Sequence, residues 1–287
     1  MISDLDDLVG WRHHLHRHPE LSHKETETAA AIESFLRHCH PHRLITRLGG
    51  YGVAAVFKGQ KRGKSILLRC DLDALPIRET NDLEYNSVTP GVSHKCGHDG
   101  HMVIMLGVAR ELYRSGLAAG EVILLFQPAE ERGEGALKVL EDPKFKDIQP
   151  DLVFALHNLP GFPRGNIIIR KKEFASASVG MEIKLFGKTS HAGEPDKGIN
   201  PSTAVAGIIE RFNSLEKNQK FQATAFITIV HVLLGEIAYG TSAGYAEIRA
   251  TLRAHRNPDM KKLGDMARQL VKKIASAEKL KLGIKMV

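Results

Sequence analysis

The chain has 287 residues, of which 43% are hydrophobic and 25% are charged, and its net charge is +7. This length allows two domains with separate apolar cores, and the composition is ordinary for a globular protein. No apolar run reaches the roughly 18 to 20 residues that a membrane span requires. The start of the chain is acidic and lacks the basic and apolar pattern of a secretory signal. We therefore expect a cytoplasmic protein without a membrane partner.

The three cysteines are Cys39, Cys70 and Cys96, an odd number without CxxC spacing. A disulfide framework is therefore not expected. In a reducing compartment a thiolate is free to bind a metal ion.

The excess of basic residues falls late in the chain, where apolar residues recur at helical spacing. A nucleic-acid surface would combine basic with aromatic residues, but residues 258–287 contain no aromatic side chain. We interpret these lysines as the solvated face of a helix and expect no nucleic-acid partner. A nucleic-acid binder that uses this helix is kept as a rival hypothesis.

The first half of the chain begins with two helices and a hairpin. Pro19 separates the helices, and Gly49 and Gly50 mark the turn of the hairpin. The expected elements are helices at 4–18 and 25–40 and strands at 43–48 and 52–58.

Short apolar strands then alternate with helices. The expected elements are strands at 65–70, 121–126 and 151–156 and a helix at 101–115. Continuous apolar strands indicate a sheet that is covered on both faces, so we predict an α/β fold with a mixed sheet flanked by helices.

The pattern changes near residue 175. The expected elements are strand 180–186, helix 200–217, strands 224–234 and 244–254, helix 258–276 and a strand near 280–287. This β-α-β-β-α-β order is ferredoxin-like. We therefore predict two domains, a first at 1–175 and a second, smaller one at 176–287.

Chemically active residues follow three of the predicted strands at their carboxyl ends. They are Asp71 and Asp73 after the first, Glu130 and Glu131 after the second, and His157 after the third. In open α/β sheets, ligands bind beyond the carboxyl ends of the strands. A histidine at a strand end is by itself more often structural. Because His157 is expected at the same edge of the sheet as the acidic residues, we favour a role as a metal ligand.

A Cys-Gly-His sequence lies between the first two of these strands. Cys96 and His98 can reach one ion from a tight loop, because Gly97 allows a sharp bend. Such a pair is weak evidence alone, but it becomes strong beside strand-end carboxylates. Thiolate and imidazole suit zinc, cobalt or nickel better than magnesium.

The two adjacent glutamates can divide their roles. One can bind a metal while the other accepts a proton from water. A helix N-terminus that favours acidic residues is the structural alternative, but Pro128 and Gly133 indicate an irregular segment. We interpret Asp71 and Asp73 as ligands or, preferably and mainly for Asp73, as acceptors that orient a histidine.

The N-terminal histidines resemble a metal-binding tract. They are His13, His14, His16 and His18. Four histidines on one helix do not converge on a single ion, and they are far in sequence from the carboxylates. We interpret them as a surface or packing feature.

Taken together, these motifs resemble the M20 family of metallopeptidases, in particular its amidohydrolase branch of N-acyl-amino-acid, hippurate and indole-acetyl-amino-acid hydrolases. The resemblance covers essentially the whole chain. The matching stretches are His18–Ser22, Asp71–Pro76, Cys96–His101, Gln127–Glu131, Leu156–Asn158 and Ser190–Gly193.

The resemblance implies a hydrolase with two divalent metal ions, such as zinc, manganese, cobalt or nickel. It also implies that residues 1–175 form a metal-binding catalytic domain and residues 176–287 a lid or dimerisation domain. The implied metal ligands are Cys96, His98, Glu131 and His157. The implied general base is Glu130. It also implies that His191 stabilises the oxyanion, often across a dimer, and that Arg253 holds the substrate carboxylate. The expected partners are a small N-acyl amino acid or dipeptide-like substrate and a second copy of the chain.

Two departures from the family pattern affect these expectations. The family commonly has an asparagine thirteen residues before the arginine, where this chain has Gly240, so substrate recognition is expected to differ. Family members also continue after the lid domain with further strands and one more histidine ligand. We therefore expect this chain to lack the C-terminal part of the catalytic domain, to bind metal weakly and to hydrolyse acyl-amino acids poorly, if at all. The alternatives are a catalytically impaired remnant that only dimerises or binds a small molecule, and an aminoacylase or dipeptidase with the same site.

Overall fold

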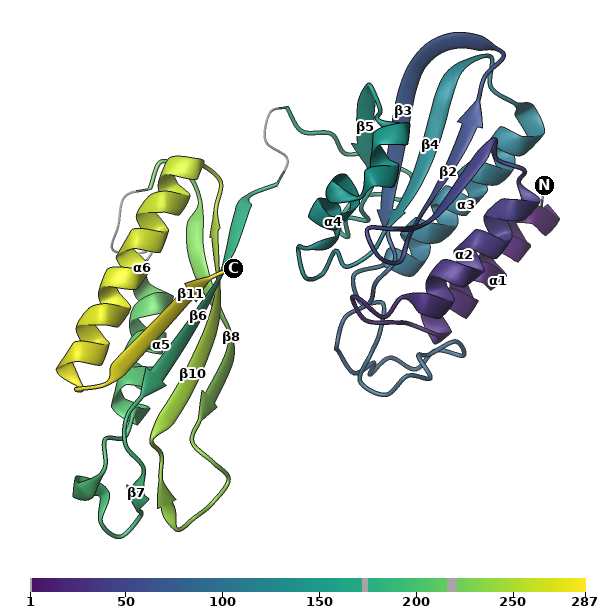
Figure 1. Ribbon diagram of the computed structural model, residues 1–287. Coiled ribbons are helices and arrows are strands. Elements are labelled where there is room, and N and C mark those ends of the chain that lie inside the picture. Colours follow the sequence, from purple (N-terminus) through teal and green to yellow (C-terminus); the bar gives the residue numbers. More distant parts are fainter. Residues whose placement is uncertain (1, 172–174, 216–220) are drawn as a thin grey trace. The chain divides into compact units, whose positions relative to one another are not determined.

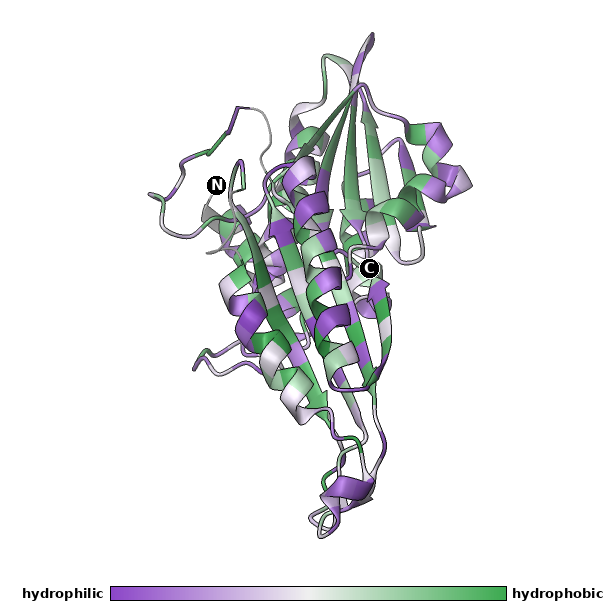
Figure 2. Ribbon diagram, turned by 90° about the vertical axis from the view of Figure 1, so that its left-hand side faces the viewer, coloured by the Kyte–Doolittle hydropathy of each residue, from purple (hydrophilic) through white to green (hydrophobic). Residues whose placement is uncertain are grey.

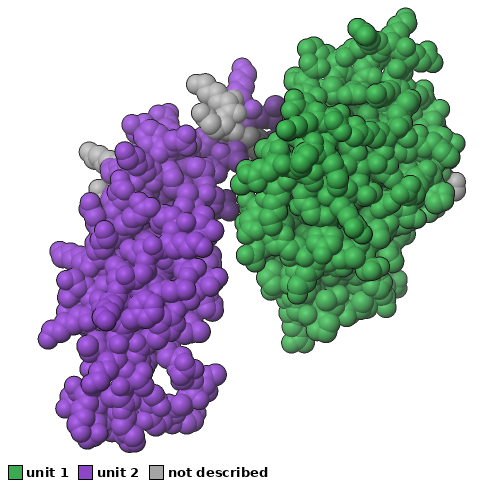
Figure 3. Space-filling model, in the orientation of Figure 1, with its two compact units in different colours: residues 1–164 green, residues 165–287 purple. Residues whose placement is uncertain are grey.

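A computed structural model describes residues 2–171, 175–215 and 221–287. The chain forms two compact units, Met1–Arg164 and Gly165–Val287 (Figure 3). The division falls at residue 164, somewhat before the expected boundary at 175, and the catalytic and lid roles of the units remain predictions. Within the described ranges, no helix is both long and apolar enough to cross a membrane.

Unit 1 consists of a five-stranded sheet with helices around it (Figure 1). Its elements are α1 (Ile2–Arg17), α2 (Thr26–His38), β1 (Arg43–Leu48), β2 (Gly52–Lys58), β3 (Lys61–Asp71), α3 (His98–Ser115), β4 (Ala119–Gln127), α4 (Gly135–Glu141), the short 3-10 helix η1 (Pro143–Ile148) and β5 (Leu152–Ala155). The strand order is β1-β2-β4-β3-β5. The mixed α/β sheet expected from the sequence is confirmed.

The sheet is mixed because β1 and β2 form an antiparallel hairpin while the other three strands are parallel. Gly49 adopts φ +61° at the hairpin turn, and a Cβ there would lie 2.7 Å from the backbone nitrogen of Val139. Parallel strands β3, β4 and β5 end at the same edge of the sheet. The residues that follow these three strands therefore lie at one edge of the sheet.

Each face of this sheet packs against different helices. One core contains side chains of α1, α2 and α3, among them Leu15, Ile32 and Leu106, against β2 and β4. The other contains Val139 of α4 and Ile148 of η1 against the opposite face. The strands are accordingly mainly hydrophobic in colour, whereas the helices are mixed (Figure 2). Burial on both faces explains the continuous apolar strands.

Unit 2 has the β-α-β-β-α-β order that the sequence predicts. Its elements are β6 (Ala177–Phe186), β7 (Ser190–His191), the 3-10 turn η2 (Pro195–Lys197), α5 (Ser202–Leu215), β8 (Ala225–Leu234), β9 (Thr241–Ser242), β10 (Tyr245–Ala254), α6 (Asn257–Ala277) and β11 (Lys281–Met286). The antiparallel sheet has the order β11-β6-β10-β8, while β7 and β9 form a separate two-stranded ribbon.

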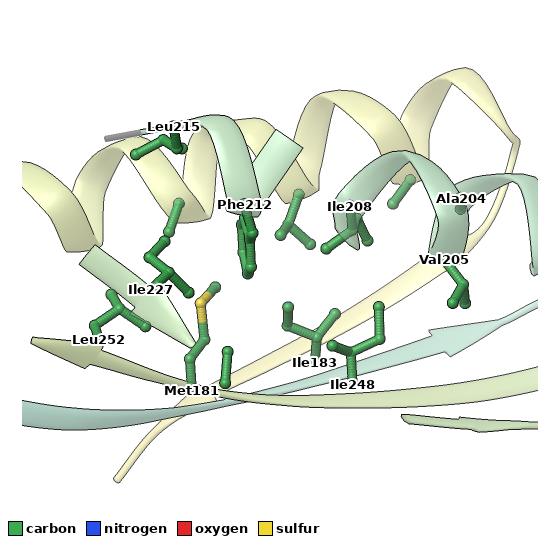
Figure 4. Close-up of a cluster of buried hydrophobic side chains, with 14 of the residues drawn as sticks. Met181, Ile183, Ala204, Val205, Ile208, Phe212, Leu215, Ile227, Ile248 and Leu252 are labelled. Carbon is green, nitrogen blue, oxygen red and sulfur yellow. The ribbon is translucent and has the colours of Figure 1, made fainter. Parts of the chain in front are cut away.

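The core of unit 2 lies between its sheet and helices α5 and α6. Ile208 and Phe212 of α5 point toward Met181, Ile183 and their neighbours on the strands (Figure 4). In α6 the buried residues are spaced three and four apart, and the lysines between them are exposed. The basic late segment is therefore an amphipathic helix, as the sequence indicates.

Candidate functional site

The carboxyl ends of the three parallel strands bring the candidate residues of unit 1 together. Asp73 follows β3, the pair Glu130 and Glu131 follows β4, and His157 follows β5 by two residues. Cys96 and His98 reach the same place from the start of α3. Three separate strand ends and one helix start therefore contribute to a single cluster.

The loop before α3 depends on glycine for its shape. Gly97 has φ +89° and precedes the first helical residue, His98. A Cβ on Gly97 would lie 2.8 Å from Oδ1 of Asn158, so a larger residue would clash with the segment that carries His157. The glycine lets Cys96 and His98 approach that segment closely.

The side chains of this cluster lie within ligand-sharing distance of one another. Cys96 Sγ is 3.3 Å from His157 Nε2. His98 Nε2 is 3.9 Å from Glu130 Oε2 and 3.8 Å from Glu131 Oε1. Potential ligand atoms of Cys96, His98 and His157 lie within 4.8 Å of one another, and so do those of His98, Glu130 and Glu131. His98 belongs to both groups.

Hydrogen bonds orient both histidines toward the centre of the cluster. Nδ1 of His98 donates to the backbone oxygen of Asp73 at 2.7 Å, and Nδ1 of His157 donates to the backbone oxygen of Asn158 at 2.8 Å. Each ring therefore presents the lone pair of Nε2 to the cluster. This is the usual arrangement of a metal-binding histidine.

The donor set fits a cation. His98 Nε2 and Glu131 Oε1 are buried, and neither has a hydrogen-bond partner among the described residues. A lone pair that faces a carboxylate oxygen at 3.8 Å is unfavourable unless a positive charge lies between them. A thiol, two imidazoles and carboxylates are also ligands that transition metals accept.

The electrostatics of the cluster point the same way. Burial, together with the neighbouring carboxylate of Glu131, raises the pKa of the Cys96 thiol to about 12. Burial also raises the pKa of Glu131 itself. Burial is the main cause of both shifts and neighbouring carboxylates add to them, whereas a bound cation would oppose them.

Asp73 fixes the turn that carries the two glutamates. Its carboxylate accepts hydrogen bonds from the backbone nitrogens of Glu130 and Glu131 at 3.1 and 3.0 Å, and from the hydroxyl of Ser22 at 2.6 Å. Its Oδ1 is 3.7 Å from His98 Nδ1. Asp73 thus orients the Glu130–Glu131 turn through its carboxylate and His98 through its backbone oxygen.

Asp71 lies outside this cluster. Its carboxylate contacts the guanidinium of Arg69, which lies two residues earlier on β3. Burial raises the pKa of Asp71 to about 7, although the charge of Arg69 opposes that shift. Asp71 is not in either group of potential metal ligands among the described residues.

The remaining candidate residues lie in unit 2. His191 is exposed on β7, which pairs with β9, and the backbone oxygen of Gly240 accepts from Ala192 at 2.9 Å. Gly240 therefore lies beside the His191 segment. Arg253 is exposed on β10, opposite Ser178 of β6.

Some residues of the site were not identified from the sequence. Glu25 is fully buried and accepts from the backbone nitrogen of Ala129 at 2.8 Å. The ring of His101 lies 2.8 Å from Oδ1 of Asn158. Glu25 carries no motif signal, whereas His101 lies within the Cys-Gly-His stretch and could have been considered.

The N-terminal histidines do not join the cluster. His16 is buried and its Nδ1 lies 2.9 Å from Oδ2 of Asp99, while His13 stacks on the ring of Tyr85. This agrees with their interpretation as packing residues. Because Asp99 follows His98 directly, this packing also supports the start of α3.

Comparison with known proteins places the chain in a family. The model of peptidase family M20/M25/M40 matches residues 67–284. N-acetylcysteine deacetylase of Bacillus subtilis (strain 168) is 33% identical over 271 residues, which are 94% of this chain and 70% of that protein. Hippurate hydrolase of Campylobacter jejuni is 31% identical, over 99% of this chain and 75% of that protein.

Solved structures agree with the sequence comparison. The crystal structure of the Bacillus subtilis YXEP protein, described as a dinuclear metal-binding peptidase of the M20 family, is 30% identical with a TM-score of 0.71. The alignment covers 98% of this chain and 73% of that one. The chain spans 66 to 75% of the length of the curated relatives compared. On this evidence, the chain belongs to peptidase family M20/M25/M40.

Proposed function

We propose that the chain is a metal-dependent amidohydrolase that cleaves the amide bond of N-acyl amino acids. The observation that carries this proposal is the convergence of Cys96, His98 and His157 with the carboxylates of Glu130 and Glu131. The names of the relatives, N-acetylcysteine deacetylase and hippurate hydrolase, support the choice of substrate class.

The residues that would hold two divalent ions are Cys96, His98, Glu131 and His157. Thiolate and imidazole ligands favour zinc, cobalt or nickel, and the carboxylate also accepts manganese. Bound ions would supply Lewis acidity and would lower the pKa of water. All three cysteines are free, which supports the proposal of a reducing, cytoplasmic location.

Glu130 is the proposed general base. Its side chain is 38% exposed, against 18% for Glu131, so it can be reached by water and substrate. In this role its carboxylate accepts a proton from the attacking water and then gives it to the leaving amine. Asp73 holds the backbone of Glu130 and keeps the carboxylate at the site.

His191 and Arg253 are the proposed substrate-binding residues of unit 2. Nδ1 of His191 accepts from the backbone nitrogen of Gly193 at 3.1 Å, which places the ring proton on Nε2. That proton is available for the developing oxyanion of the acyl group. Arg253 offers a guanidinium for the carboxylate of the amino acid.

Turnover by the metal-loaded chain tests the proposal. The chain is stripped of metal, reloaded separately with Zn²⁺, Co²⁺ and Mn²⁺, and assayed on N-acetyl amino acids and hippurate. We expect amide hydrolysis with at least one metal, and its loss in Cys96→Ala. Metal binding without hydrolysis of any of these substrates would favour the non-catalytic binding protein, and no metal binding would contradict the site itself.

We also propose that unit 2 forms a homodimer through β8. This strand lies at the edge of its sheet, and it exposes apolar side chains, including Val230 at 59% and Leu234 at 44%. Exposed apolar edge strands tend to pair with another chain. We expect Val230→Lys to convert a dimer into a monomer in sedimentation analysis, whereas Leu137→Lys, at an equally exposed position of unit 1, leaves the dimer intact.

A further inference from the structure

The segment between α1 and α2 reaches the candidate site without contributing a metal ligand. Ser22 donates its hydroxyl to Oδ2 of Asp73 at 2.6 Å, and Glu25 accepts from the backbone nitrogen of Ala129 at 2.8 Å. Leu21 forms an isolated β-bridge with Ala74. The segment therefore contacts both the end of β3 and the end of β4.

Three consecutive backbone N–H groups are bound by two carboxylates. Glu25 binds that of Ala129, and Asp73 binds those of Glu130 and Glu131. The carboxylates come from distant parts of the sequence, one before α2 and one after β3. Together they define the direction in which the chain leaves β4.

This turn needs external support because its backbone is unusual. Ala129 has φ +51°, in the left-handed region that residues with a Cβ seldom adopt. Such conformations persist only where the surroundings hold them, and they are frequent at functional sites. The hydrogen bond from Ala129 to Glu25 acts at the strained residue itself.

Capping of α2 does not account for Glu25. It occupies the position before the first turn of α2, yet its side chain makes no capping hydrogen bond there. The side chain is fully buried, and Oε2 has no hydrogen-bond partner within the described part of the chain. Burying a carboxylate is costly, so a residue that only filled space at this position would be expected to be apolar.

We propose that Glu25 and Ser22 are positioning residues that hold the Glu130–Glu131 pair in its metal-binding and proton-accepting geometry. This inference rests on the proposed function, because it assumes that Glu131 binds metal. It assigns a role to the His18–Ser22 stretch and its continuation, which contain no ligand. Neither Glu25 nor Ser22 touches the substrate or the metal in this scheme.

Co²⁺ binding to the full chain tests the proposal independently of catalysis. The variants are Glu25→Met, which removes the acceptor at similar size, Glu25→Gln, which keeps an acceptor, and Ser22→Ala. Loss of a residue that orients a ligand typically weakens metal binding about 10- to 100-fold. We expect Glu25→Met to lose Co²⁺ affinity within this range and to change the visible absorption of bound Co²⁺. Ser22→Ala should lose about 10-fold, and Glu25→Gln should bind Co²⁺ as the original chain does.

Two control variants distinguish a positioning role from a general effect of removing a carboxylate. Asp142→Ala removes a carboxylate that accepts from the backbone nitrogens of Gly49 and Lys144, away from the Glu130–Glu131 turn, and should leave Co²⁺ affinity unchanged. Glu131→Gln removes a proposed ligand itself. If Glu131→Gln binds Co²⁺ as well as the original chain does, the proposed function fails at its metal site.

The positioning role is overturned if Glu131→Gln loses affinity while Glu25→Met and Ser22→Ala keep both affinity and spectrum. If Glu25→Met does not fold, Ser22→Ala decides, because this half-buried serine loses only a hydroxyl. Equal weakening in Glu25→Gln and Glu25→Met would also contradict the role of a hydrogen-bond acceptor.

Discussion

Glu130 and Glu131 are neighbours in sequence but differ in their surroundings. Both lie close to His98 Nε2, yet Glu131 is the more buried of the two, with 18% of its side chain exposed against 38% for Glu130. The more exposed Glu130 has room for water beside its carboxylate. The difference supports separate roles, with Glu131 as ligand and Glu130 as base.

Glutamine substitutions should separate these roles. We expect Glu130→Gln to keep Co²⁺ affinity and to lower kcat by about 10²- to 10⁴-fold, which is the usual contribution of a general base. Glu131→Gln should instead weaken Co²⁺ binding. Metal titration and steady-state kinetics on hippurate provide the two measurements, and equal effects of both variants on metal binding would contradict the assignment.

At the scale of single elements, one carboxylate connects two parts of unit 1. Asp142 begins η1 and accepts from the backbone nitrogens of Lys144 at 3.0 Å and Gly49 at 2.8 Å. It therefore joins η1 to the hairpin between β1 and β2. These hydrogen bonds to the charged form lower the pKa of Asp142.

Asp142→Ala should destabilise unit 1 by about 1 kcal/mol, as loss of a capping side chain does. Because the pKa of Asp142 is lower in the folded state, its carboxylate stabilises the fold fully above the unfolded pKa of about 3.9 and loses this effect as the pH falls through the folded value. The difference in free energy of unfolding between Asp142→Ala and the original chain, measured with urea, should therefore become smaller at acidic pH. Glu141→Ala, at an exposed neighbour, should show little effect.

The elements themselves could largely be predicted from the sequence. The hairpin strands 43–48 and 52–58 have the predicted bounds, because short apolar runs and paired glycines are local signals. Helix α3 begins at His98 rather than at 101, because its start is set by Gly97 and by packing on Asn158. The short helices α4 and η1 were not predicted, since seven and six residues are too few to show a clear helical periodicity.

The candidate site was predictable only in part. The parallel strands confirm that Asp73, Glu130, Glu131 and His157 share one edge of the sheet. Glu25 was not predictable, because its partner is a backbone N–H group more than a hundred residues away. Almost every residue has a backbone N–H group, so the sequence does not show which one a side chain binds. Supporting residues are therefore harder to identify than metal ligands.

At the scale of the whole molecule, each hydrophobic core belongs to one unit. Both cores of the first unit consist of residues before 149, and the core of the second consists of residues after 180. The potential metal ligands Cys96, His98, Glu130, Glu131 and His157 all lie in unit 1. Metal should therefore stabilise the two units unequally.

The single tryptophan allows the effect of metal on the stability of unit 1 to be measured. Trp11 packs on Phe35 within unit 1, at 5.3 Å between ring centroids, so its fluorescence reports that unit alone. Zn²⁺ at a hundred times its dissociation constant should stabilise unit 1 by about 2.7 kcal/mol, and EDTA should reverse this. Hydrogen exchange of the β6 and β10 amides should stay unchanged, because no proposed ligand lies on those strands. If β6 and β10 gained the same protection as unit 1, the metal would act on both units, and its assignment to unit 1 would be wrong.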